Sequence, residues 1–228
     1  MAELLNIPIP DISQSYYDDS DLSSISMGLS SIQDNLSQYI SVAAALCKIP
    51  YNLILSIIFI ESAGKNVGMN GAGAIGLMQV TGGTAYDTIR LIDYAGELSF
   101  GMKSIISSKI PSANYKMRGN QLIFWNQNIA IPEINNALGD PQFNILLGSM
   151  YLRLALDKTV TSGKARLDKA VIMYNFGMYN PFYSTSDWST EDSSTLYENP
   201  ALPTETKNYI LKLIGVNGTL DILLNNKT

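Results

Sequence analysis

Histidine is absent from this sequence, and cysteine occurs once, at Cys47. Without histidine, Ser-His and Cys-His nucleophilic pairs are excluded, as are zinc sites that use imidazole. A lone cysteine forms no internal disulfide and no thiolate cluster, and its apolar surroundings predict a buried packing role. Catalysis must therefore rest on carboxylates, hydroxyls, amides or backbone groups, and we predict neither a metal site nor a cofactor.

Positive charge is also scarce. The chain has 15 Lys and Arg against 20 Asp and Glu, a formal net charge of −5. No cluster of basic residues reverses this balance locally, so a nucleic-acid partner is not expected.

Long apolar runs are missing as well. The most hydrophobic stretch, residues 53–60, contains Ser56 and falls far short of the roughly 20 residues that cross a bilayer. We read it as a core helix and predict no membrane span. The opening MAELLNIPIPDISQ has an acidic residue where a secretory signal would be basic, so no Sec signal is predicted.

The composition is that of a globular chain, with 228 residues of which 46 % are hydrophobic. Residues 1–24 are polar and without a sustained period, and we expect a loose N-terminal arm there. One domain is predicted over residues 25–228, with an insertion at about 86–139.

Hydrophobic periodicity predicts a mainly α fold. Apolar residues three and four positions apart indicate a helix over residues 22–46, and Pro50 separates it from a second helix over 51–62. Further helices are predicted near 143–156, 165–176, 205–214 and 220–225. The glycine-rich residues 70–80 favour a loop or small β-hairpin, the best candidate for β-structure.

Glu61 is the most informative acidic residue. It ends the apolar stripe of Ile54, Ile57 and Ile58 by helical spacing, and a glycine-rich turn follows it. A carboxyl group against apolar side chains keeps its proton near neutral pH, which suits a general acid. We expect the glycines to leave room for a bulky substrate.

Four segments, in this order, resemble the catalytic domain of lytic transglycosylases of the SLT, goose-lysozyme-like type. They are ESAGK at 61–65, GAIGLMQVTGGTA at 73–85, DPQFNILLGSMYL at 140–152 and AVIMYNFG at 170–177. The segment at 205–213 is similar to the closing helix of that family. Agreement at several ordered motifs is stronger evidence than one short motif.

The resemblance implies a lysozyme-like helical domain and a reaction on peptidoglycan glycan strands. The β-1,4 bond between N-acetylmuramic acid and N-acetylglucosamine would be cleaved with formation of a 1,6-anhydromuramoyl end, and Glu61 would act as both acid and base. That agrees with the local sequence, where no other acidic residue lies between Glu61 and Asp87.

By the same resemblance, Ser62, Met78, Gln79, Tyr174 and Asn175 are candidate substrate-binding residues. Each has a plainer alternative: a serine can cap a helix end, the loop residues can form a packed turn, and a tyrosine in an apolar helix is often core.

Two other carboxylates have structural explanations. Asp140 before Pro141 is the signature of a helix N-cap, and Glu205 can be a first-turn residue favoured by the helix dipole. We do not predict a second catalytic carboxylate.

The insertion contains Phe100, Tyr115, Phe124 and Trp125. They are candidate aromatic platforms for sugar rings, and the alternative is a helical pair that only packs.

Three alternatives to a transglycosylase stay open: a lysozyme-type hydrolase on the same scaffold, a non-catalytic cell-wall-binding component and a chitin-cleaving enzyme. Because peptidoglycan lies outside the cytoplasm and no export signal is visible, we expect delivery by a bacteriophage particle, a lysis system or a secretion machine.

Overall fold

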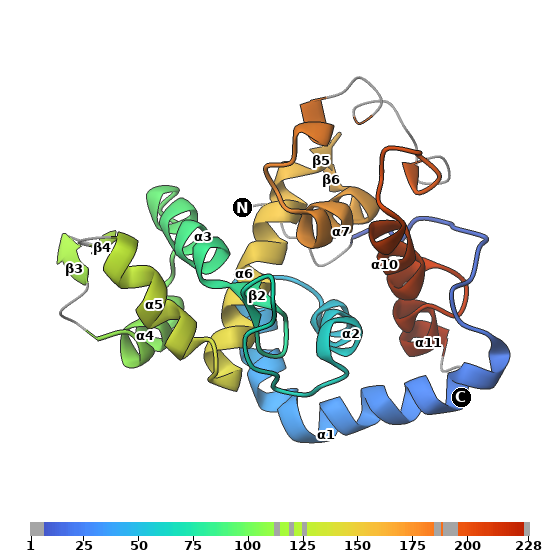
Figure 1. Ribbon diagram of the computed structural model, residues 1–228, viewed down its shortest axis with the longest axis horizontal. Helices are drawn as coiled ribbons and strands as arrows, with labels where there is room; N and C mark the ends of the chain where they lie inside the picture. The colour runs from blue at the N-terminus through green and yellow to red at the C-terminus, as the bar shows by residue number, and fades with distance from the viewer. Residues whose placement is uncertain are drawn as a thin grey trace. The chain divides into compact units, whose positions relative to one another are not determined.

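The computed structural model describes residues 7–111, 115–118, 121–124, 127–184, 188 and 196–225. These residues form helices and short two-stranded hairpins (Figure 1), so the predicted mainly α class is confirmed. The chain divides into two compact units. The central unit is Ile32–Leu154, and the terminal unit combines the residues up to Ser31 with those from Ala155 onward.

The helices of the central unit begin and end at recognisable signals. Pro50 precedes α2 and Ala63, at φ 50°, ends it, as a left-handed residue commonly does. Thr81 caps α3 by accepting a hydrogen bond from the Thr84 N–H at 3.1 Å. The bounds are α1 Leu22–Cys47 and α6 Pro141–Lys158, which both continue into the terminal unit, α2 Tyr51–Ser62, α3 Gly82–Tyr94, α4 Phe100–Lys109 and α5 Gln127–Ala137.

A small hairpin follows α2. Its strands, β1 (Ala74–Ile75) and β2 (Val80–Thr81), pair antiparallel, which confirms the hairpin predicted near residues 70–80. Two more hairpins, absent from the sequence prediction, are β3 (Tyr115–Arg118) with β4 (Gln121–Phe124) and β5 (Val160–Thr161) with β6 (Lys164–Ala165). The turn between β5 and β6 is Ser-Gly with positive φ at both residues, a hairpin signal that helical periodicity hides.

The core of the central unit centres on α2. All residues from Leu53 to Ile58 are buried, which explains why this stretch lacks helical amphipathicity. Cys47 is 1 % exposed, and this burial raises the pKa of its thiol to about 12, although Arg153 opposes the shift. The predicted packing role of Cys47 is confirmed.

The segment after α3 has its own packing. Helix α3 packs against α5 and β4. The buried carboxylate of Asp93 accepts a hydrogen bond from the Leu122 N–H at 2.9 Å and lies 3.8 Å from the Lys103 ammonium. This carboxylate therefore holds β4 against α3 and α4.

The terminal unit contains the C-terminal helices and the N-terminal segment. Its elements are η1 Asp19–Asp21, α7 Leu167–Phe176, η3 Pro181–Ser184, α10 Thr204–Ile214 and α11 Thr219–Asn225. The N-terminal segment runs beside the α10–α11 turn, where the Val216 N–H donates to the Gln14 carbonyl at 2.9 Å. The helices confirm those predicted at 165–176, 205–214 and 220–225, whereas the domain boundary at residue 24 stays a prediction.

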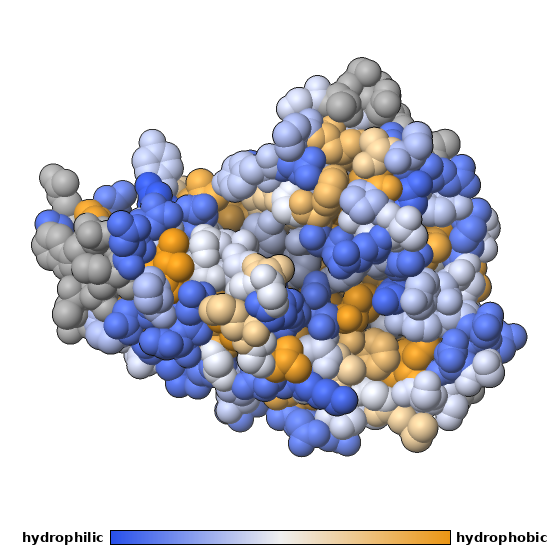
Figure 2. Space-filling view, viewed as in Figure 1, coloured by the Kyte–Doolittle hydropathy of each residue, from blue (hydrophilic) through white to orange (hydrophobic). Residues whose placement is uncertain are grey.

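Polar residues dominate the face drawn in Figure 2, and apolar residues are exposed there in small groups on both units. No helix among the described residues has the length and apolar character needed to cross a membrane. In the same part of the chain, no three acidic or cysteine side chains gather closely enough to hold a metal ion.

Candidate active site

Glu61 lies in the last turn of α2, half-buried. Helical spacing places it on the face of Ile54, Ile57 and Ile58, and these three side chains are 0 % exposed. The carboxyl group is thus attached to a tightly packed helix of the central unit. Such an anchor fixes the position of a side chain better than a loop does.

The loop after α2 is tied back to the helix end by Ser62. The Ser62 hydroxyl lies 2.8 Å from the Leu77 carbonyl and 3.1 Å from the Ile58 carbonyl, and both are acceptors. The second is the back-bond common for a helical serine, whereas the first joins α2 to the loop. Ser62 therefore sets the distance between Glu61 and the strand residues that follow.

Gln79 has an unusual backbone and a fixed side chain. Its φ of 47° is left-handed, a conformation uncommon for residues other than glycine. Its amide nitrogen donates to the Gly76 carbonyl at 2.8 Å, and its amide oxygen accepts from Asn70 Nδ2 at 3.0 Å. Each amide atom retains one further hydrogen-bonding position, so Gln79 can still bind an acetamido group.

The side chain of Met78 is buried and is not exposed at the surface of the loop. Its side chain is 0 % exposed, and its sulfur accepts a long hydrogen bond from the Ser149 hydroxyl at 3.9 Å. A Cβ atom at Gly148 would lie 2.6 Å from that sulfur, so the glycine on α6 makes room for Met78. A side chain in this position supports the loop from beneath and meets a sugar only after rearrangement.

Sequence reasoning missed Asn144, a residue of α6 that is 0 % exposed. Its Oδ1 accepts from the Met78 N–H at 2.9 Å, and its Nδ2 donates to the Ile75 and Leu138 carbonyls at 2.8 and 3.0 Å. One amide therefore satisfies three buried backbone groups around the loop. The signal for such a buried amide is a polar residue among the apolar residues of the segment 141–156.

Asn144 also explains Gly76. A Cβ atom there would lie 2.3 Å from Asn144 Nδ2, and the φ of Gly76 is 77°. We expected the loop glycines to leave room for substrate. At Gly76 the expectation is wrong, because the space is filled by a side chain of the protein itself.

Tyr174 and Asn175 belong to the terminal unit, on α7. Tyr174 is 8 % exposed, and the Oδ1 of Asn175 accepts from the Thr206 hydroxyl at 2.7 Å. Thr206 is itself buried on α10, so this hydrogen bond links the two helices. The structure brings Ser62, Met78 and Gln79 together with Glu61 in one unit. The roles of Tyr174 and Asn175 stay predictions.

Asp140 is a helix cap, as predicted. Its Oδ1 accepts from the Phe143 N–H at 3.0 Å, and its Oδ2 binds the Lys109 ammonium at 2.6 Å. Partial burial raises the pKa of this carboxyl, but the hydrogen bonds from Lys109 and Phe143 outweigh burial and lower it. Glu205 occupies the first turn of α10 and is exposed, in keeping with its predicted structural alternative.

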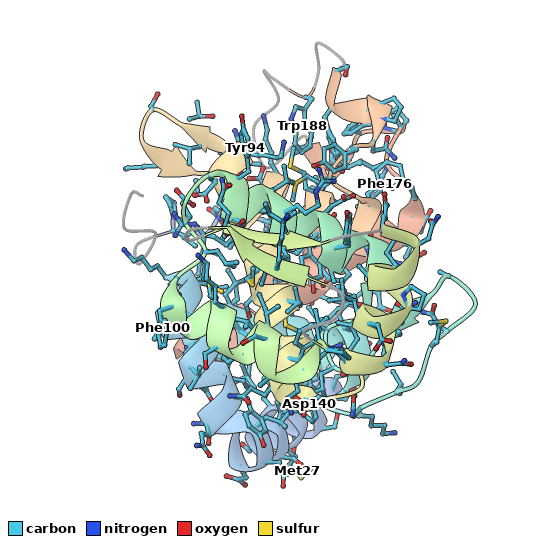
Figure 3. All side chains as sticks on the ribbon, turned by 90° about the vertical axis from the view of Figure 1, so that its left-hand side faces the viewer. Met27, Tyr94, Phe100, Asp140, Phe176 and Trp188 are labelled. Carbon is cyan, nitrogen blue, oxygen red and sulfur yellow. The ribbon has the colours of Figure 1, made fainter. Side chains whose placement is uncertain are left out.

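Of the insertion's aromatic residues, Phe100 is 89 % exposed at the start of α4. Tyr94, which the sequence analysis did not single out, is 87 % exposed and lies well apart from Phe100 (Figure 3). The side chains of Tyr115 and Phe124, and all of Trp125, lie outside the described residues. The sugar-platform hypothesis therefore stays a prediction.

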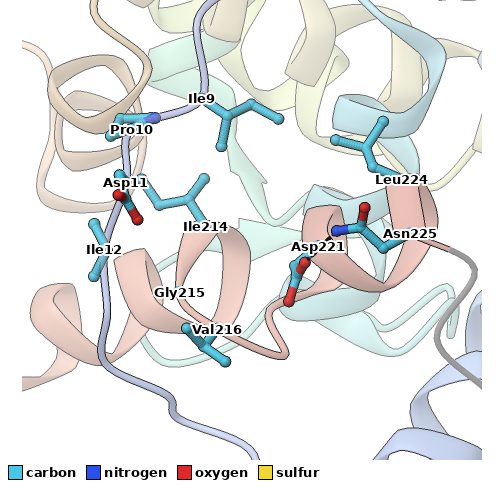
Figure 4. Close-up of a pocket in the computed structure, with 10 residues that line it drawn as sticks. All are labelled: Ile9, Pro10, Asp11, Ile12, Ile214, Gly215, Val216, Asp221, Leu224 and Asn225. Carbon is cyan, nitrogen blue, oxygen red and sulfur yellow. Dashed lines mark hydrogen bonds between the residues drawn. The ribbon is translucent and has the colours of Figure 1, made fainter.

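A pocket of about 360 Å³ lies in the terminal unit (Figure 4). The segment from Ile9 to Ile12, the turn at Gly215 and helix α11 line it. None of the predicted site residues contributes to its walls.

Residues 38–122 match the family model described as the Transglycosylase SLT domain. The matched segment includes Glu61, the loop with Gln79 and helices α3 and α4. A search of the curated proteins found no match. This match supports the SLT-type lytic transglycosylase domain that the sequence motifs predicted, and the mainly α fold is consistent with a lysozyme-like domain. The assignment supports a transglycosylase activity of this family on peptidoglycan.

Proposed function

We propose that the protein cleaves the β-1,4 bond between N-acetylmuramic acid and N-acetylglucosamine and leaves a 1,6-anhydromuramoyl end. The observation that carries this proposal is the position of Glu61. It extends a buried apolar face at the end of α2, within the matched segment and beside the loop that carries Gln79.

Glu61 performs both proton transfers. Its protonated carboxyl donates to the glycosidic oxygen as the bond to the muramic C1 breaks, and the N-acetylglucosamine leaves with a free hydroxyl. The resulting carboxylate takes the proton of the muramic 6-hydroxyl, whose oxygen bonds to C1. Glu61 ends in its starting state, and no water is consumed.

The location of Glu61 suits the first of these transfers. An acidic side chain in the last turn of a helix faces the negative end of the helix dipole, which disfavours its charged form. Its apolar helix face acts in the same direction by excluding water. Both effects favour a carboxyl that holds its proton until the leaving oxygen takes it.

The other predicted residues bind the substrate or hold the loop that binds it. In this proposal Gln79 binds an acetamido group, and Ser62 and Met78 hold the loop that carries Gln79, Ser62 through its bond to Leu77. Tyr174 and Asn175 complete the site from α7, on the basis of the family resemblance. The substrate's own N-acetyl group stabilises the oxocarbenium-like centre, which removes the need for a second carboxylate.

The test is a digest of purified sacculi with the wild-type protein and the Glu61→Gln variant, followed by mass spectrometry of the released muropeptides. We expect anhydro ends from the wild type and a loss of about 10²–10⁴-fold in rate from Glu61→Gln, which is the usual contribution of a positioned acid-base group. Glu97→Gln, which makes the same charge change in the central unit, should retain full activity.

The products also separate the alternatives. Reducing ends, heavier by one water, would show a hydrolase on the same scaffold. Binding to sacculi without any released fragment, unchanged in Glu61→Gln, would show a non-catalytic wall-binding component. Release of fragments from chitin at the rate found for peptidoglycan would show a chitinase.

We further propose that a phage particle or a secretion machine delivers the protein to the cell wall. The support is the site of the substrate, which lies outside the cytoplasm. Mass spectrometry of purified phage particles tests the first route, and its failure to detect the chain there would leave the secretion machine to be tested.

A further inference from the structure

Asn70 lies in the middle of the loop that follows α2. It is exposed, and its Oδ1 accepts from the N–H groups of Ala72 and Ala74 at 2.9 and 3.0 Å. Its Nδ2 donates to Gln79 Oε1 at 3.0 Å. Asn70 therefore connects the backbone turn before β1 to the side chain of the predicted substrate-binding glutamine.

The direction of these bonds is fixed by backbone groups. A backbone N–H only donates, so the Asn70 atom that faces Ala72 and Ala74 must be the oxygen. The Asn70 nitrogen then points at Gln79 and requires the Gln79 oxygen opposite it. On the other side, the Gly76 carbonyl only accepts, so it requires the Gln79 nitrogen.

Rotation of the Gln79 amide by half a turn would break both contacts. The Gln79 nitrogen would face the Asn70 nitrogen, and the Gln79 oxygen would face the Gly76 carbonyl. Both pairs are mismatched, donor against donor and acceptor against acceptor. The left-handed backbone of Gln79 holds the side chain where both partners reach it.

We propose that Asn70 is a positioning residue that locks the Gln79 amide in one orientation and thereby sets the orientation of the N-acetyl group that Gln79 binds. This inference rests on the proposed function. The remaining N–H of the Gln79 amide can donate to the carbonyl of an acetamido group, and the remaining lone pair of its oxygen can accept from the acetamido N–H. With the Gln79 amide fixed, both hydrogen bonds form in only one orientation of the acetamido group. Sugars that carry a hydroxyl in place of the N-acetyl group lack this pair and are rejected.

Asn70→Asp is the informative variant. Its carboxylate keeps the acceptor for Ala72 and Ala74, so the turn remains, but it offers no donor to Gln79. We expect kcat/KM on glycan strands to fall about tenfold, the typical worth of one such hydrogen bond, mainly through KM. Thermal stability should stay close to that of the wild type, because Asn70 is exposed.

The direct readout is the side-chain ¹⁵N–¹H signal of Gln79, assigned through Gln79→Glu. In the wild type its two protons should have well-separated shifts and slow exchange. In Asn70→Asp the shifts should approach those of a free glutamine amide. Asn66→Asp is the matched control: it adds the same charge in the same segment and loses only an exposed bond to the Gly139 carbonyl.

Four outcomes decide the inference. Altered Gln79 signals with a raised KM in Asn70→Asp, and neither change in Asn66→Asp, support it. Unchanged Gln79 signals overturn it, whatever the activity. Altered signals with unchanged kcat/KM overturn its substrate part. An inactive wild type with the predicted Gln79 signals would instead contradict the proposed function and leave the orientation lock intact.

Discussion

The loop that follows Glu61 and helix α7, which packs against α10, were predicted to contribute residues to one site, yet they depend on polar contacts to different extents. The loop buries Ile75, Leu77 and Met78, and its backbone groups also depend on hydrogen bonds to the amide of Asn144 and the hydroxyl of Ser62. Helices α7 and α10 pack through buried apolar side chains, and the bond from Thr206 to Asn175 adds a polar link.

This difference determines how much stability each region loses when one polar side chain is removed. A loop held by buried hydrogen bonds loses several at once when one amide is removed, and its partners stay buried without replacements. A pair of helices distributes its free energy over many apolar contacts, so loss of one polar link costs less. The following predictions test this contrast, from the largest effect to the smallest.

Asn144→Ala should have the largest effect. It leaves the Met78 N–H and the Ile75 and Leu138 carbonyls without their partner, and we expect the free energy of unfolding to fall by about 3 kcal/mol. Urea denaturation measures the change, and activity on sacculi should fall with it. Asn136→Ala, on the exposed side of α5, should change stability by less than about 0.5 kcal/mol. Equal effects of the two variants would show that Asn144 does not hold the loop.

Gly76→Ala should follow, with a loss of about 2–3 kcal/mol from backbone strain and contact with Asn144 together. Gly73→Ala is the matched control, because its φ is 80° but no atom lies within 4 Å of the added Cβ. Strain alone should cost it about 1 kcal/mol. Thermal unfolding of both variants isolates the contacts with Asn144 and the Leu138 carbonyl as their difference, and identical melting temperatures would disprove those contacts.

Thr206→Val should cost only about 1 kcal/mol, because it removes one hydrogen bond and conserves the shape of a buried side chain. A double-mutant cycle with Asn175→Ala measures the bond itself. We expect a coupling free energy of about 0.5–1 kcal/mol. A coupling of zero would mean that α7 and α10 are joined by apolar packing without help from this pair.

Asp140→Asn should have the smallest effect, and this effect should disappear at acid pH. The native pKa of Asp140 is lowered, so its charged form stabilises the fold above the unfolded pKa of about 3.9, and this contribution is lost as pH falls through the lower native value. Melting temperatures from pH 6 to pH 2 test this. The melting temperature of the wild type should exceed that of the variant at higher pH and lose this excess below about pH 4. A difference in melting temperature that stays constant with pH would contradict the assignment.

Much of the fold could be predicted from the sequence, because its signals are local. Pro50 and the apolar residues after it predicted α2, and Asp140 with Pro141 predicted the start of α6. The β3–β4 hairpin was missed because its strands are only four residues each, too short for a clear alternation.

The candidate site was predictable to a smaller extent. The motifs identified Glu61 and Gln79, but nothing local revealed that Met78 is enclosed or that Asn144 reaches the loop from 66 residues away in the chain. Packing of this kind depends on which helix lies beneath the loop, and periodicity within a helix carries no such information.

The sequence by itself determined the helices outside the insertion, the absence of histidine chemistry and the acidic residue on which a mechanism can rest, because composition and local spacing decide these. Helices α3, α4 and α5, which lie mostly in the insertion, were not predicted. Only the tertiary structure decided which side chains fill the space at Gly76 and Gly148 and which backbone groups fix Gln79. The physical reason is that buried polar groups need partners, and those partners come from distant segments that folding brings within hydrogen-bond reach.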